Sequence, residues 1–331
     1  MNNIVEVYKN IYKVEIPLKG NPLKYINVYV IKSEDESLII DTGFNTDEIL
    51  ELTKEYMNEL NIIPSKSHLY LTHLHSDHTG LINYFDKLGV EIYMPDVDAK
   101  LLKLFRERHG EHWTNIEKYA HMQGLDEDEL KIEDHPGYKF RPREDFNYTS
   151  KNPGDMINIG DFEFEVIDLS GHTPGMAGLY DREKDLLFCG DHILGEITPN
   201  IQFWGFDVGD SLGTYFKNLE KVRDLNIKHL YGSHRTLIKD VNARVDELLN
   251  HHKDRLSETV DALKRGATTV RDVTKQMHWD ISAKNWDEFP KSQKWFAAGE
   301  AHAHLEHLRS LGICDYEVEN GILHYKLINK A

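Results

Sequence analysis

Apolar residues in the first part of the chain come in short clusters rich in β-branched and aromatic side chains, separated by polar turns. Such clusters predict β-strands at residues 12–16, 26–31, 38–40, 68–72 and 91–94. Residues 47–60 differ, because their apolar side chains recur at the three- and four-residue spacing of an amphipathic helix. Strands interleaved with helices indicate an α/β fold in which helices cover a sheet.

The segment from residue 98 to 148 breaks this alternation. It is highly charged and rich in His, Arg and aromatic side chains, and it predicts helices at residues 101–113 and 115–122. We interpret it as a helical insertion over the sheet and a candidate lid. Beyond it we expect a helix at residues 212–225 and strands at residues 162–169, 178–180, 185–189 and 229–231.

After residue 240 the pattern of apolar residues changes from alternating strands and helices to a series of helices. Helical patterns occupy residues 240–263, 269–277 and 292–311. Two short strand patterns then flank Asn320-Gly321, a pair typical of tight hairpin turns. Three helices followed by a hairpin predict a winged-helix-like C-terminal domain at residues 241–331, preceded by a catalytic domain at residues 1–240.

Composition excludes several classes of protein. The 39 basic and 56 acidic residues give a net charge of −17, and 13 basic against 15 acidic residues from Asp240 onward leave no basic C-terminal face. Nucleic acid is therefore an unfavoured partner. The two cysteines stand far apart, and neither a signal-like nor a membrane-spanning apolar run occurs. We expect a cytoplasmic protein with no membrane partner.

One number is unusual, because the chain contains 19 histidines. Four residues that can bind a metal fall within six positions, directly after the strand expected at 68–72: His73, His75, Asp77 and His78. Imidazole and carboxylate ligands together suit zinc, iron, manganese or cobalt. A chain that turns at a strand end can direct such side chains to one or two ions.

Three further candidates stand in the same context. His172, Asp191 and His234 each come just after an expected strand and next to glycine. His192 follows Asp191 directly, and we expect it not to bind metal, because adjacent side chains at a strand end point apart.

These segments resemble the five motifs of the metallo-β-lactamase-fold hydrolases, in order and complete, with Asp41 of Asp-Thr-Gly as the first. The resemblance covers roughly residues 4–240. It implies an αββα sandwich, in which two mixed sheets pack face to face with helices outside and a binuclear metal site at one sheet edge.

The resemblance also implies a role for each residue. His73, His75 and His172 would hold one divalent metal ion, Asp77, His78 and His234 a second, and Asp191 would bridge the two. Asp41 would orient the histidine loop from beneath. Zinc is the metal expected first, with iron or manganese as alternatives.

Two metals about 3.5–4 Å apart can bridge a hydroxide that attacks a substrate. The resemblance implies that Asp77 is the catalytic acceptor of the nucleophile's proton. No serine nucleophile motif occurs. The C-terminal region and residues 23–29, 190–194 and 197–201 are similar to a glyoxalase II-like branch of the family, which implies a hydrolase of a small ester or thioester. Antibiotic-degrading β-lactamases usually carry cysteine in place of Asp191.

Three other functions remain open at this stage. A phosphodiesterase or endoribonuclease would need a basic track beside the metals, which the net charge disfavours. Quorum-signal lactonases often place tyrosine where this chain has Leu194. A metal sensor whose C-terminal domain binds DNA is the non-enzymatic alternative.

Substrate-binding candidates come from the aromatic and basic residues. Tyr25, Phe203 and Trp204 are candidate walls of an apolar pocket. A substrate carboxylate or phosphate suits the bidentate guanidinium group, and four arginines of the insertion are candidates for such a contact: Arg106, Arg108, Arg141 and Arg143. We expect a small-molecule substrate and propose a homodimer through the C-terminal domain.

Overall fold

The computed structural model describes residues 3–34, 36–107 and 110–328 of the chain. Within these residues the first sheet follows chain order: β1 (Ile4–Tyr8), β2 (Ile11–Pro17), β3 (Tyr25–Lys32), β4 (Ser37–Ile40), β5 (Ser67–Tyr70), β6 (Glu91–Met94) and β7 (Thr149–Ser150). Neighbours from β1 to β4 pair antiparallel, and those from β4 to β7 pair parallel. The sheet is therefore mixed.

The second sheet has the order β12 (His229–Gly232), β11 (Leu186–Gly190), β10 (Ala177–Asp181), β9 (Phe162–Asp168) and β8 (Met156–Ile159). Only β11 and β12 pair parallel among these described strands. The sequence predicted β9 to β12 but not β8, nor β1 and β7 of the first sheet. β7 and β8 are short, β8 has only two buried apolar side chains, Ile157 and Ile159, and β1 has no fully buried residue.

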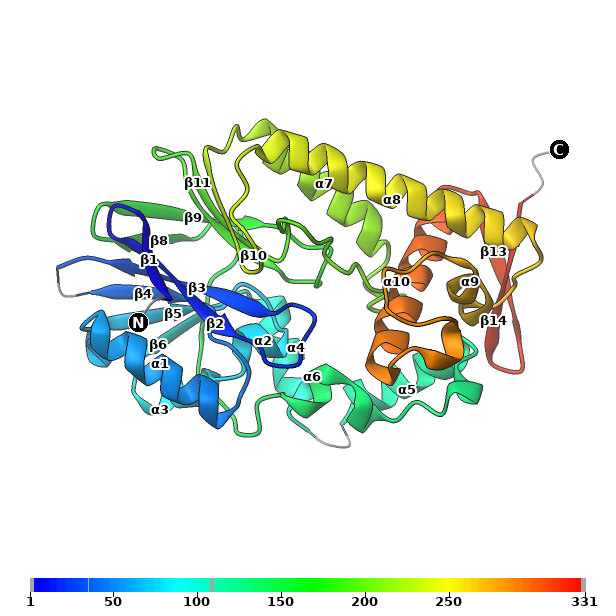
Figure 1. Ribbon diagram of the computed structural model, residues 1–331, viewed down its shortest axis with the longest axis horizontal. Helices are drawn as coiled ribbons and strands as arrows, with labels where there is room; N and C mark the ends of the chain where they lie inside the picture. The colour runs from blue at the N-terminus through cyan, green and yellow to red at the C-terminus, as the bar shows by residue number, and fades with distance from the viewer. Residues whose placement is uncertain (1–2, 35, 108–109, 329–331) are drawn as a thin grey trace.

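The two sheets pack face to face around a shared apolar core. Tyr29 of β3 lies against Phe188 of β11 and Tyr231 of β12, with ring centroids 5.1 and 5.4 Å apart. Helices cover the outer faces (Figure 1): α1 (Asp47–Glu59), η1 (Pro64–Lys66), α2 (Ser76–Thr79), α3 (Ile82–Lys87) and α4 (Asp96–Phe105) on the first sheet, and α7 (Ser211–Asp224) with α8 (Val241–Lys264) on the second. The predicted αββα sandwich is confirmed.

The insertion is organised differently from the prediction of one helix over residues 101–113. Helix α4 ends at Phe105, and α5 (Glu111–Met122) begins after Gly110, whose extended backbone at ψ 166° caps it. The rest of the insertion is short helical segments, namely η2 (Asp126–Asp128), η3 (Ile132–Asp134) and α6 (Pro136–Lys139).

The insertion also reaches the C-terminal region. The buried Asp128 carboxylate accepts hydrogen bonds from Arg271 Nε and Lys294 Nζ, both at 2.7 Å. Figure 1 shows α5 running along the lower edge towards β14. The insertion therefore joins the sandwich to the C-terminal region.

The C-terminal region has its own apolar core and contains α9 (Val270–Gln276), η4 (Trp286–Glu288), α10 (Lys291–Ser310), β13 (Cys314–Glu319) and β14 (Ile322–Leu327). Helix α8 belongs to two cores, because Val241 to Leu249 pack on the second sheet and Ala262 and Leu263 pack on α10 and its neighbours. Asn320 and Gly321 adopt φ of 52° and 84°, so the predicted hairpin turn is present.

The three helices and the hairpin occur in the predicted order, and the winged-helix-like classification stays a prediction. No helix among the described residues combines the length and the apolar character needed to cross a bilayer.

Candidate metal centre

Four strands end at one rim of the sandwich and carry every candidate ligand. The chain leaves β5 into His73 and His75 and then forms α2, which contains Asp77 and His78. His172 lies beyond the end of β9, Asp191 directly follows β11, and His234 lies two positions beyond the end of β12. The structure thus brings all seven residues that the sequence singled out to one place.

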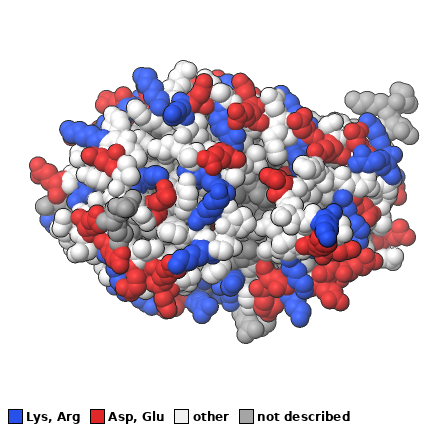
Figure 2. Space-filling model, viewed as in Figure 1, with Lys and Arg blue, Asp and Glu red and all other residues white. Residues whose placement is uncertain are grey.

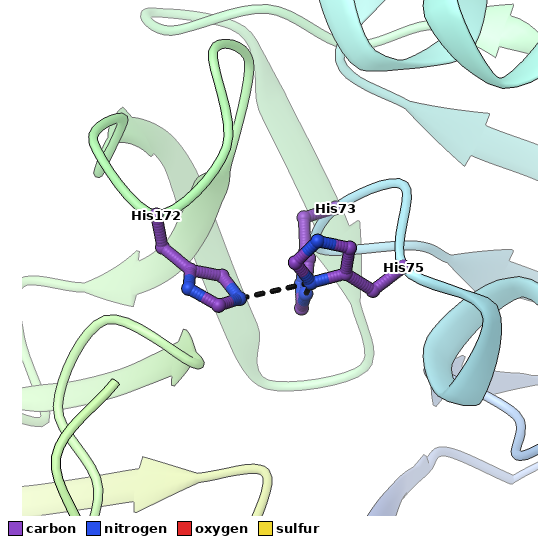
Figure 3. Close-up of side chains that lie close together, drawn as sticks. All are labelled: His73, His75 and His172. Carbon is purple, nitrogen blue, oxygen red and sulfur yellow. Dashed lines mark hydrogen bonds between the residues drawn. The ribbon is translucent and has the colours of Figure 1, made fainter. Parts of the chain in front are cut away.

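The first group consists of His73, His75 and His172 (Figure 3). His75 Nδ1 lies 3.1 Å from His73 Nε2 and 2.9 Å from His172 Nε2, so one nitrogen of each ring faces the same point. His172 comes from a separate loop across the rim. Three imidazole nitrogens in this arrangement offer one face of a tetrahedral metal site.

The second group consists of Asp77, His78 and His234. Asp77 Oδ2 lies 3.2 Å from His234 Nε2 and 3.7 Å from His78 Nε2. All three side chains are at least nine-tenths buried. A carboxylate and two imidazoles directed at one point suit a second divalent cation.

Asp191 lies between the two groups. Its Oδ2 is 3.7 Å from His172 Nε2, and its Oδ1 is 3.5 Å from both His78 Nε2 and His234 Nε2. The two oxygens of one carboxylate therefore face different groups, as a carboxylate that bridges two ions would.

Unsatisfied polar atoms support a metal at this position. Asp77 Oδ2, His78 Nε2, Asp191 Oδ1 and His234 Nε2 are buried and make no hydrogen bond within the described chain. Buried polar atoms normally have partners, and atoms that converge without any are suited to a cation. The residues therefore fit the divalent metal centre that the fold implies.

The hydrogen bonds made by Nδ1 of three histidines determine that Nε2 is the nitrogen that faces the site. His172 Nδ1 lies 2.8 Å from the Asn200 carbonyl oxygen, and His234 Nδ1 lies 2.7 Å from that of Tyr25. A carbonyl only accepts, so Nδ1 carries the proton and donates it, which leaves the Nε2 lone pair free for a metal. His78 Nδ1 donates likewise to Asp41 Oδ2 at 2.8 Å.

Asp41 ties three strand ends together. Its carboxylate accepts hydrogen bonds from the backbone N–H of Thr72 at 2.9 Å and from the Ser233 hydroxyl at 3.3 Å, besides that from His78. Its backbone lies in the left-handed region at φ 62°, a conformation that aspartate tolerates better than most residues. Asp41 thus lies beneath the histidine loop, where the resemblance expects it.

The charges of the second group compensate one another without a metal. Burial raises the pKa of Asp77, but the neighbouring His78 and His234 outweigh it and lower that pKa to about 2. Burial lowers the pKa of His234, and Asp191 and Asp77 together raise it to about 10. The site is therefore built around carboxylates that stay ionised and attract positive charge.

Sequence reasoning missed Asp98, which joins the two loops of the first group. Its buried carboxylate accepts hydrogen bonds from the Thr173 hydroxyl and the Gly175 N–H, both at 2.6 Å, and from the Leu74 N–H at 2.9 Å. Burial raises the pKa of Asp98 to about 6 against the effect of these donors. It belongs to no motif, and we assigned it to the insertion.

Two of the aromatic candidates lie at the site. Trp204 stacks against His75, with ring centroids 6.0 Å apart at 27°, and its Nε1–H donates to the His172 carbonyl at 3.0 Å. Tyr25 contacts His234 through its backbone carbonyl. Phe203 packs instead on His302 of α10, at 3.8 Å between centroids.

The arginine candidates lie within the insertion. Arg141 donates to the Tyr138 and Arg106 carbonyls, and its guanidinium stacks 3.8 Å above the Tyr138 ring. Arg106 pairs with Asp145 at 3.6 Å. Arg141 and Arg143 line an open surface cavity of about 310 Å³. Arg108 lies outside the described residues.

His192 points away from both groups. Its ring packs on Tyr215 at 5.0 Å between centroids, and neither of its nitrogens has a hydrogen-bond partner in the described chain. It joins none of the ligand groups found among the described residues.

Comparison with known families agrees with the fold and the site. The profile of the metallo-β-lactamase superfamily matches residues 21–234, which include all seven candidate ligands and Asp41. The chain therefore belongs to the metallo-β-lactamase superfamily and is a hydrolase of that superfamily with His/Asp metal-binding groups.

Among its relatives, a β-lactamase-like protein 2 homolog of Caenorhabditis elegans is 27% identical over 260 residues, which are 78% of this chain and 72% of that protein. An atrochrysone carboxyl ACP thioesterase of Aspergillus chevalieri is 24% identical over 309 residues, 87% of this chain and 82% of that protein. The match to a lactamase-like protein of Aspergillus niger spans 63% of that protein's length.

Two solved structures share the fold over nearly the whole chain. A metallo-β-lactamase family protein of Thermus thermophilus superposes with a TM-score of 0.82 at 23% identity, covering 98% of this chain and 100% of the other. A β-lactamase domain protein of Burkholderia ambifaria gives 0.78 at 20% identity, with 98% and 95% covered. The fold of the C-terminal region is thus shared as well.

Proposed function

We propose that this protein is a binuclear metal-dependent hydrolase of small thioesters or esters, with the thioester preferred. The observation that carries the proposal is the position of Asp191, whose two oxygens face two separate groups of three ligand atoms. His73, His75 and His172 would hold one ion, and Asp77, His78 and His234 the other. Zinc is our first candidate, because imidazole and carboxylate ligands suit it.

Two bound divalent ions supply a hydroxide nucleophile at neutral pH and polarise the substrate carbonyl. In thioester hydrolysis the oxygen of water adds to the carbonyl carbon, the carbon–sulfur bond breaks, and a carboxylic acid and a thiol result. Asp77 would take the proton of the nucleophile, since its carboxylate faces the same point as His78 and His234. Trp204, stacked on His75, would form one wall of the substrate site.

Charge and similarity favour a small acyl substrate over a nucleic acid. The net charge of −17 repels polyanions, and the face in Figure 2 carries acidic and basic side chains side by side without a continuous basic track. A relative named as an acyl carrier protein thioesterase aligns with 87% of the chain. These observations support the thioester as the substrate.

The test compares kcat/KM of the zinc-loaded protein on an acyl thioester of N-acetylcysteamine and on bis(p-nitrophenyl) phosphate. Asp77→Asn serves as the inactive reference, and Asp224→Asn, an exposed aspartate at the end of α7, is the matched control. We expect the thioester to be preferred by orders of magnitude. A preference for the phosphodiester would overturn the substrate assignment, and full activity of Asp77→Asn would overturn the assignment of the site.

A further inference from the structure

One loop connects the candidate metal centre to the C-terminal region. Residues 199–204, which we call the 199–204 loop, lie between β11 and α7. On one side the loop holds His172, because the Asn200 carbonyl accepts from His172 Nδ1 at 2.8 Å and Trp204 Nε1 donates to the His172 carbonyl at 3.0 Å. Both the ring and the backbone of His172 are thus fixed by this loop.

Helix α10 holds the other side of the same loop. The Asn200 side-chain Nδ2 donates to Glu300 Oε2 at 2.7 Å, and the Phe203 N–H donates to the Gly299 carbonyl at 3.0 Å. Phe203 also stacks on His302, two positions beyond Glu300. The contact is close, since a Cβ at Gly299 would lie 3.2 Å from the Gln202 side chain.

Glu300 is itself anchored and buried. Its second oxygen, Oε1, accepts from Arg255 Nε of α8 at 3.3 Å, and the Arg255 guanidinium stacks 4.0 Å from the Trp279 ring. Glu300 and Arg255 are only 7% and 5% exposed. A buried carboxylate with one oxygen on a fixed arginine and the other on Asn200 is a rigid point of attachment.

We propose that Glu300 is a positioning residue of the metal centre and that α10 sets the metal affinity of the His73–His75–His172 group. The route runs from Glu300 through the Asn200 side chain to the Asn200 carbonyl and from there to His172 Nδ1. The C-terminal region then completes the metal site in addition to stabilising the fold. This inference rests on the metal-binding part of the proposed function and on no substrate.

Helix α10 provides a matched control. Glu306 lies on the same helix and is 6% exposed, but it pairs with Arg309 at 2.7 Å and accepts from the Tyr325 hydroxyl at 2.7 Å. Both of these partners belong to the C-terminal region. Removing either glutamate therefore weakens that region, and only the removal of Glu300 releases the 199–204 loop.

The experiment measures zinc affinity of the full chain by competition with a chromophoric chelator, together with the visible absorption of the cobalt-loaded protein. We compare the wild type with Glu300→Ala, Asn200→Ala, the double variant and Glu306→Ala. Loss of an outer partner of a metal-binding histidine costs about 10- to 100-fold in affinity, and we expect about tenfold for one of two metal equivalents in Glu300→Ala.

Five further results are expected. Asn200→Ala gives the same loss, the double variant loses no more than either single variant, and the cobalt absorption of all three shifts in the same way. Glu300→Gln, which keeps an oxygen for Asn200, restores most of the affinity. Glu306→Ala lowers the melting temperature and keeps both metal affinities.

The inference is overturned if Glu300→Ala and Asn200→Ala keep both affinities within about twofold, or if Glu306→Ala loses as much. Should Glu300→Ala fail to fold, Asn200→Ala decides alone, because that residue lies in a loop. A wild-type protein that binds two metal equivalents and hydrolyses no thioester contradicts the proposed substrate and leaves this inference standing.

Discussion

The Asp98 carboxylate accepts a 2.6 Å hydrogen bond from the Thr173 hydroxyl and so ties α4 to the loop that carries His172. The same oxygen accepts from the Leu74 N–H, between His73 and His75. One buried side chain thus sets the distance between the two loops of the first ligand group, although it contacts none of the three histidine rings through a hydrogen bond.

Replacing Asp98 by alanine should destabilise the fold and loosen the first ligand group. The change leaves three buried donors without an acceptor, namely the Leu74 and Gly175 N–H groups and the Thr173 hydroxyl. Each unsatisfied donor costs about 1–3 kcal/mol, so we expect a loss of at least about 3 kcal/mol in the free energy of unfolding. Urea titration measures it, and zinc competition should show weaker binding.

Asp96→Ala is the control for Asp98→Ala. It removes an aspartate from the same turn of α4, but one that contacts Tyr148 and Lys100 at the surface. We expect an unfolding midpoint close to that of the wild type. Equal losses of unfolding free energy in Asp96→Ala and Asp98→Ala would show that Asp98 only stabilises the first turn of α4.

Replacing Asp41 by asparagine should weaken metal binding while preserving the shape of the residue. One carboxylate oxygen of Asp41 accepts from the Thr72 N–H and the other from His78 Nδ1, and asparagine replaces one of these oxygens by an NH₂ group, which donates and does not accept. When the amide oxygen stays on the Thr72 N–H, His78 loses the partner that keeps its Nε2 directed inward. We expect about 10- to 100-fold weaker binding of one zinc equivalent, measured by chelator competition. Unchanged affinity would contradict the role assigned to Asp41.

Removing the metals should lower the stability of the protein. A ligand that binds only the folded state at 100 times its dissociation constant adds about 2.7 kcal/mol of stability. We therefore expect dipicolinate to lower the melting temperature of the zinc-loaded protein and zinc to restore it. The chelator should lower the melting temperature of His234→Ala by less than that of the wild type. His278→Ala, at an exposed position, should show the same decrease as the wild type. The same melting temperature with and without the chelator would contradict metal binding.

The sequence allowed most of the sandwich and all seven candidate ligands to be predicted, since strand ends next to glycine carry the motif residues. The partners that orient them were not predictable. The Asn200 and Tyr25 carbonyls act through the backbone, which side-chain identity does not encode. Asp98 meets Gly175 across 77 positions, and in sequence it looks no different from the surface residue Asp96.

The role of the C-terminal region escaped prediction for a related reason. Its helices and hairpin follow from periodicity and from Asn320-Gly321, but Glu300 looks like one more charge on a helix. Its contact with Asn200 joins positions 100 residues apart, and neither residue belongs to the metal-binding motifs. Only the folded arrangement shows that this helix lies behind His172.

Acid should destabilise the protein through buried histidines of the insertion and of the C-terminal region. Burial lowers the pKa of His135 to about 4, and burial lowers that of His302 and His304 to about 3, against about 6.5 in an unfolded chain. The unfolded state therefore binds more protons than the folded state between pH 6.5 and about 4. The contribution of these three histidines to stability should be complete above pH 6.5 and fall as the pH drops through this range.

His135 allows this to be tested with one substitution. Its ring packs on Trp113 and Trp295, so His135→Phe keeps an aromatic ring and removes the titration. One histidine contributes a slope of about 1.4 kcal/mol per pH unit, and about 2 kcal/mol in total at pH 5. Urea unfolding of the chelator-treated protein from pH 7 to pH 4.5 should show that slope reduced in His135→Phe and retained in His278→Phe. An identical slope in His135→Phe and wild type would mean that His135 takes up its proton without unfolding.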